Sequence, residues 1–259
     1  MVLALCVGGL TSIVHAGSLG SIDLSYTGMG AGSRMVINYS GSSGPTISGK
    51  TVWAGELNYT VGAASGAGAS LTGQQITTFG IDIWQTAGSM NSELGKLANG
   101  PTTNGIAGQM GADRAGLLGA LYSFAGYDQS MFLGGGFSGP DQAMMASAFQ
   151  LAIWEIVSED GFDPNAASFS ESGLDVTSGA FSVKMYEGAG IPSTLSLAQR
   201  MLKNAWEAWV PGSETSLLIA GGNGGPDVIM IHTIPLPHTF IMTSLGLLGA
   251  IMLRRRLTP

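Results

Sequence analysis

Charged residues and cysteine are both scarce in this chain of 259 residues. Only 10% of the residues are Asp, Glu, Lys or Arg, well below the roughly 25% usual for globular proteins. The single cysteine, Cys6, lies at the start of the chain, so the rest has no thiol for a disulfide, a thiolate metal site or a nucleophile. Disulfide-stapled scaffolds and cysteine-dependent enzymes are therefore excluded.

Histidine is almost as rare, and the three histidines, His15, His232 and His238, all lie near the ends. A Ser-His-Asp mechanism needs a histidine in the folded body, and zinc sites are built mainly from His and Cys. We therefore expect no catalytic residue, no metal ligand and no cofactor. An enzyme that uses a carboxylate pair stays open as an alternative, because 17 acidic residues allow many pairs.

Positive charge is sparse and concentrated at the C-terminus. The formal net charge is −7, and Arg254, Arg255 and Arg256 are three of only ten basic residues. An acidic body of this kind repels phosphate backbones, so we expect no nucleic-acid partner. The 41 glycines lack a Gly-X-Y repeat, and they indicate a β-rich domain with many turns.

The first 16 residues have the pattern of a secretory signal. Val2 to Val14 are apolar or small, and Val14-His15-Ala16 precedes Gly17. An apolar core followed by small residues at a cleavage site is typical of signal peptides. The alternative interpretation is a buried N-terminal strand. We expect residues 1–16 to be a signal peptide and the protein to be secreted or held at the cell envelope.

The C-terminal segment, 234–259, has three features in a fixed order. Pro235-Leu236-Pro237 comes first, an apolar stretch from Thr239 to Leu253 follows, and Arg254-Arg255-Arg256 closes it. The stretch is shorter than the roughly 20 residues of a comfortable membrane span, and the arginines favour a tail inside and a body outside.

These features resemble the PEP-CTERM sorting segment, with Pro-Leu-Pro in place of the name-giving Pro-Glu-Pro. The resemblance implies a single hydrophobic helix and an exosortase-type processing enzyme as partner at the membrane. A plain C-terminal anchor that is never cut is the alternative.

Between the ends we expect one domain, 18–232, of the α+β class with a helical insertion. Alternating apolar residues and turn signals predict strands, and the 3.6-residue period predicts helices. The predicted strands are 22–26, 35–39, 57–61, 75–84, 181–185, 216–220 and 228–231. The predicted helices are 113–124, 141–157 and 196–209.

One of these helices carries a recognisable motif, Gln150-Leu151-Ala152-Ile153-Trp154. It resembles the glutamine helix of the thioester domains of bacterial surface adhesins. In that family a cysteine on an upstream strand bonds to the glutamine, and the matching position here is Gly80. Glycine has no side chain, so no thioester can form with Gln150. The resemblance implies a thioester-domain-like body with a degenerate site.

A purely structural interpretation of the motif is also available. Trp154 is then a core residue, and Gln150 hydrogen-bonds the backbone of the Gly80 strand, since a buried amide needs partners. Glu155 is then solvated or caps a neighbouring loop. The acidic run from Glu159 to Asp163 predicts a solvated loop, with calcium binding as the alternative.

The sequence thus predicts a non-enzymatic exported protein of the cell envelope or extracellular biofilm matrix, processed through its C-terminal sorting signal. The alternative function is a non-covalent surface adhesin. It would bind surface polysaccharide, another glycan or a protein in a groove between the Gly80 strand and the Gln150 helix, with Trp84 as a contact.

Overall fold

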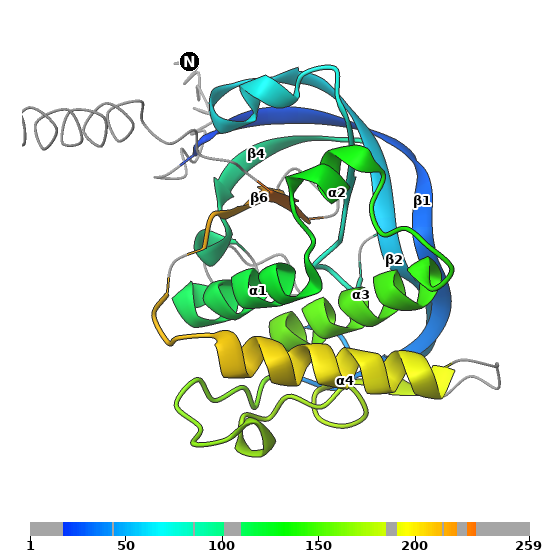
Figure 1. Ribbon diagram of the computed structural model, residues 1–259, viewed down its shortest axis with the longest axis vertical. Helices are drawn as coiled ribbons and strands as arrows, with labels where there is room; N and C mark the ends of the chain where they lie inside the picture. Colours follow the sequence, from blue (N-terminus) through cyan, green and yellow to red (C-terminus); the bar gives the residue numbers. More distant parts are fainter. Residues whose placement is uncertain are drawn as a thin grey trace, which may run out of the picture.

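The computed structural model describes residues 18–42, 44–84, 86–100, 110–184, 191–213, 215–221 and 227–231. In these residues a strongly curved antiparallel sheet wraps around one side of a group of helices (Figure 1). The predicted mixture of strands and helices in a β-rich body is confirmed. The predicted segments at 1–16 and 234–259 lie outside the described residues.

The two longest strands are β1 (Gly20–Tyr39) and β2 (Ile47–Ala64). β1 unites the predicted strands 22–26 and 35–39, so the glycine-rich stretch between them does not end the strand. Gly32 pairs with Gly55 across the two strands. A Cβ on Gly32 would lie 2.6 Å from the Ala54 carbonyl oxygen, and this close approach requires glycine.

Five shorter strands complete the sheet of seven. The strand order is β3-β2-β1-β4-β6-β7, and β5 also pairs with β1. The bounds are β3 (Gln75–Thr78), β4 (Met90–Lys96), β5 (Phe181–Lys184), β6 (Leu217–Gly221) and β7 (Val228–Ile231). β4 is a strand that the sequence did not predict, because its run Met-Asn-Ser-Glu-Leu-Gly-Lys lacks β-branched and aromatic residues.

The two ends of this strand order meet. The predicted strand 75–84 leaves β2 after Thr78, and its continuation bonds to the start of β7 instead. The Ile81 amide donates to the Asp227 carbonyl over 2.9 Å, and the Ile229 amide donates to the Phe79 carbonyl over 3.1 Å. We call this junction of 79–81 with 227–229 the seam.

The helices are α1 (Gly111–Ala125), α2 (Gln129–Gly134), α3 (Gln142–Ser158) and α4 (Ile191–Ala208). Three short 3-10 segments accompany them, Gly66–Leu71, Leu97–Asn99 and Phe169–Glu171. α1, α3 and α4 correspond to predicted helices, whereas α2, which has six residues, was not predicted. Among the described helices, none is long and apolar enough to cross a lipid bilayer.

α3 is the central element of the fold. It packs against β1 and β2 on one side and against α1 and α4 on the other (Figure 1). Every residue from Ala146 to Ser158 is buried. The helix is buried all round, because α1 and α4 cover the side that faces away from the sheet. Polar side chains of α3 are therefore buried and need partners inside the protein.

Candidate functional site

The Gly80 position predicted from the motif lies in the middle of the seam. Gly80 is buried and stands opposite Val228 in an antiparallel bridge. The seam hydrogen bonds are made by the residues on either side of Gly80 rather than by Gly80 itself. In this type of pair the amide and carbonyl of the central residue point away from the partner strand. The Gly80 carbonyl therefore needs a hydrogen-bond donor from an element other than β7.

Gln150 supplies that partner. It lies on the sheet side of α3 with 1% of its surface exposed, and its Nε2 donates to the Gly80 carbonyl oxygen over 2.7 Å. The expected hydrogen bond between Gln150 and the backbone of the Gly80 strand is thereby confirmed. The bond joins residues 70 positions apart in the chain. It fixes the central helix to the seam of the sheet.

The residues that precede Gly80 and Gln150, Phe79 and Phe149, belong to a cluster of aromatic rings. The Phe149 ring contacts the rings of Phe79 and Tyr122 edge to face, with centroids 4.9 and 4.8 Å apart. Tyr127 stacks on Phe149 at 5.7 Å, and its hydroxyl donates to the Thr77 carbonyl over 2.9 Å. Because Gly80 and Gln150 are both buried, the Gly80 carbonyl has no solvent alternative to Gln150. The motif search did not identify this cluster.

The space around Gly80 shows how far position 80 is from the geometry that a thioester with Gln150 would need. A Cβ at position 80 would have the Leu57 Cδ1 at 3.6 Å and the Asp227 carbonyl oxygen at 3.9 Å, both ordinary contacts. No atom of Gln150 lies within 4 Å of that point. A thioester would place a cysteine Cβ only two bonds from the Gln150 Cδ. The present spacing suits a hydrogen bond rather than that covalent link.

Trp154 is the third residue of the predicted motif, and it is a core residue one turn after Gln150. It is 5% exposed, and its ring lies 6.2 Å from that of Phe181 in β5. Its indole N–H has no acceptor among the described residues. The structure thus brings Gly80 and Gln150 into contact, whereas Trp154 packs against another strand.

Glu155 is fully buried, so the expectation that it is solvated was wrong and the loop-capping alternative holds. Its Oε1 accepts a hydrogen bond from the Asp175 amide over 2.7 Å, in the loop that leads from α3 to β5. Its Oε2 has no partner among the described residues. Burial raises the pKa of the Glu155 carboxyl well above its usual range, and the nearby Glu159 adds to this rise.

The acidic run after α3 is tied to backbone groups rather than solvated throughout. Glu159 is 5% exposed; its Oε1 accepts from the Gly161 amide and its Oε2 from the Ala180 amide, both over 2.8 Å. Arg114 of α1 donates to the carbonyls of Ile156 and Glu159 at the end of α3, over 3.0 and 2.6 Å. This cation satisfies the last carbonyls of the helix.

The alternative prediction for this acidic run was calcium binding, which needs a cluster of metal-binding side chains. Within the described ranges, no group of three or more His, Cys, Asp or Glu side chains is arranged to hold a metal ion. The Asp163 carboxylate accepts from the Asn165 amide over 2.8 Å, which closes a local turn. The acids of this run stabilise the loop between α3 and β5.

Sequence reasoning missed a second buried carboxylate, Glu56 in β2. It is 1% exposed and accepts hydrogen bonds from the amides of Ala31 and Phe137, over 2.9 and 2.5 Å. Burial raises its pKa, although these two hydrogen bonds oppose the rise. Gly136 lies against it with φ 86°, and a Cβ there would overlap the carboxylate. No signal in the sequence predicts this contact, because Gly136 lies far from Glu56 along the chain.

The groove expected beside Gln150 is closed, because Gly80 and Gln150 are both buried. Trp84, the expected contact, is half-buried. Its indole N–H donates to the Pro45 carbonyl over 3.1 Å, and its ring meets that of Tyr39 edge to face at 4.9 Å. Trp84 therefore packs at the β1–β2 connection.

The predicted sorting residues Pro235, Leu236, Pro237 and Arg254 to Arg256 lie outside the described residues, as do all three histidines. Every functional assignment for them rests on the sequence. Comparison of the chain with protein-family models, with curated proteins and with solved structures found no match.

Proposed function

We propose that this chain is a non-enzymatic exported protein of the bacterial cell envelope or extracellular matrix. An exosortase-type enzyme would process it at the C-terminal segment 234–259. The observation that carries the proposal is the order of Pro235-Leu236-Pro237, an apolar stretch and Arg254 to Arg256 at one end, with a signal-like segment at the other. The body between them would be delivered outside the cytoplasm.

The body is proposed to be a thioester-type domain that has lost its chemistry. Support comes from Gln150, whose amide is engaged by the Gly80 carbonyl at the position where the family carries its reactive cysteine. Further support comes from Glu56, Glu155 and Glu159, which accept backbone hydrogen bonds and hold loops together. In this role the residues of the motif stabilise the fold.

The test is a pair of variants of the full chain in its own host. Replacing Pro235, Leu236 and Pro237 together by alanine should leave an uncut chain in the membrane fraction. The control Thr258→Ala changes the tail beyond the arginines and should be processed like the wild type. Immunoblots of membrane, envelope and medium fractions report the result. Equal distribution of both variants would show that Pro-Leu-Pro is not a processing signal.

A further inference from the structure

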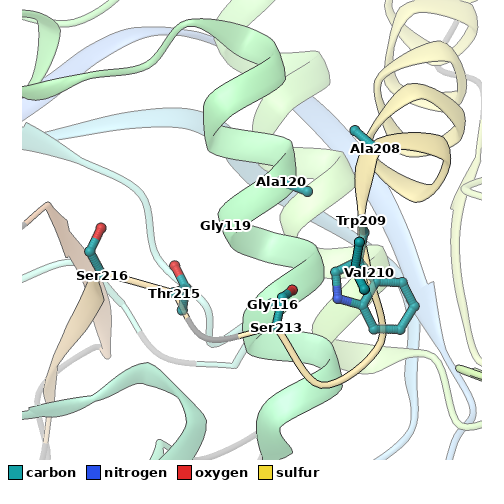
Figure 2. A pocket seen from close by; sticks show the side chains of 9 residues that line it. All are labelled: Gly116, Gly119, Ala120, Ala208, Trp209, Val210, Ser213, Thr215 and Ser216. Carbon is teal, nitrogen blue, oxygen red and sulfur yellow. The ribbon is translucent and has the colours of Figure 1, made fainter.

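A hollow of about 320 Å³ opens on the surface between α1 and the segment that follows α4 (Figure 2). It lies apart from Gly80 and Gln150, which are buried. One wall is the outer face of α1, at Gly116, Gly119 and Ala120. The opposite wall comes from the end of α4 and the chain leading to β6. It includes Trp209, Val210, Ser213, Thr215 and Ser216.

Two glycines of α1 let the opposite wall approach the helix. A Cβ on Gly116 would lie 2.7 Å from the Ser213 carbonyl oxygen, and a Cβ on Gly119 would lie 2.6 Å from the Thr215 Oγ1. Both contacts are too short for a real side chain. The hydroxyl-bearing segment is therefore packed directly on the helix, which makes the hollow a defined part of the fold.

The walls combine apolar surface with hydroxyl groups. Val210 is 66% exposed and is among the few large apolar side chains that the described surface presents. Ser213, Thr215 and Ser216 add hydroxyls at the same place (Figure 2). Trp209 is 7% exposed, and its indole N–H is a donor without an acceptor in the described part of the chain.

We propose that this hollow binds one sugar unit of a neutral polysaccharide. The apolar face of a sugar ring packs on aromatic and aliphatic side chains, while its hydroxyls exchange hydrogen bonds with serine and threonine. None of the described lining residues is charged, and the chain has a net charge of −7. Both facts disfavour an anionic ligand. The inference rests on the proposed extracellular location, where such polymers occur.

The experiment is affinity electrophoresis of the purified full chain in native gels that contain dextran, laminarin or galactomannan, with polygalacturonate as the anionic probe. At least one neutral polymer should slow migration, and polygalacturonate should not. Ala120→Trp fills the hollow and should weaken the retardation at least roughly tenfold, the effect of losing about 1.4 kcal/mol of contact. The control Ala112→Trp adds the same side chain at an exposed position of α1 outside the hollow.

A second pair guards against misfolding of the tryptophan variant. Ser216→Ala removes one lining hydroxyl and should weaken retardation, whereas Ser123→Ala on the exposed side of α1 should not. Retardation by no neutral polymer, by polygalacturonate alone, or equally in each variant and its control would overturn the proposal. These results are independent of cell fractionation, so a failure here leaves the export proposal standing, and a failure of export leaves binding by the purified chain intact.

Discussion

At the scale of single residues, the central interaction of the site is the hydrogen bond between the Gly80 carbonyl and the Gln150 amide. The carbonyl lies in the seam, where neither β7 nor β2 bonds it, and the amide reaches it from the central helix over 2.7 Å. Both residues are buried, which keeps water away. Gln150 thereby closes a polar gap in the core.

The first prediction concerns the loss of this amide. Gln150→Leu keeps a side chain of similar length but leaves the buried Gly80 carbonyl without a donor. The free energy of unfolding should fall by about 1–3 kcal/mol, the cost of an unsatisfied buried polar group. Urea unfolding followed by circular dichroism measures it.

The matched control is Gln142→Leu, at the exposed first residue of the same helix. A surface change of this kind should alter stability by less than about 0.5 kcal/mol. If the two variants unfold at the same urea concentration, Gln150 is not the residue that holds the seam.

The contact between Gly80 and Gln150 could be predicted, but only through the motif resemblance. Local periodicity placed one residue on a strand and the other on a helix, and it said nothing of their distance. The burial of Glu56 could not be predicted at all, because its hydrogen-bond donors are the amides of Ala31 and Phe137. Their approach depends on the tertiary fold.

At the scale of elements, α3 organises its surroundings through carboxylates near its C-terminal end. Glu155 and Glu159 hold the loop that leads to β5 by accepting from the amides of Asp175 and Ala180. Arg114, which lies in α1, donates hydrogen bonds to the last carbonyls of α3. The loop contains only one short 3-10 segment, so these side-chain bonds take the place of regular structure.

The second prediction is a pH dependence that belongs to this arrangement. Burial raises the pKa of Glu155 above its ordinary value of 4.5, so the folded chain keeps a proton that the unfolded chain has already released. The stabilisation is complete below 4.5 and is lost as the pH rises through the folded-state pKa. The free energy of unfolding should therefore fall with rising pH, by up to about 1.4 kcal/mol per unit.

Glu155→Gln removes this titration and should flatten the fall of stability above the ordinary glutamate pKa of 4.5. Glu56 contributes in the same direction and remains in the variant. Glu171→Gln is the matched control, because it removes an exposed carboxylate from the same loop. Urea midpoints at several pH values provide the measurement. Equal slopes in the two variants would rule out Glu155 as a source of the dependence.

The elements themselves were predicted where apolar periodicity was strong. α3 was found within one residue at each end. β4 was missed because its sequence is polar and its pairing with β1 and β6 joins segments far apart in the chain. β1 was divided in two because glycine usually interrupts a strand. Here Gly32 and Gly55 allow a close pairing that continues it.

At the scale of the whole molecule, all described strands and helices lie between Gly20 and Ile231. The segments from which we infer export lie on either side, at 1–16 and 234–259. The described part of the body has an internally satisfied glutamine, buried acids that hold loops, and a hollow of mixed apolar and hydroxyl character. This combination is compatible with the proposed matrix protein that contacts glycan without altering it.

The most direct test of export and processing is the intact mass of the wild-type protein recovered from the envelope and medium fractions of its host. The account predicts a chain that begins at Gly17 and ends between Pro235 and His238. A cytoplasmic protein that retains residues 1–16, or a membrane-bound one that retains Arg254 to Pro259, would contradict it.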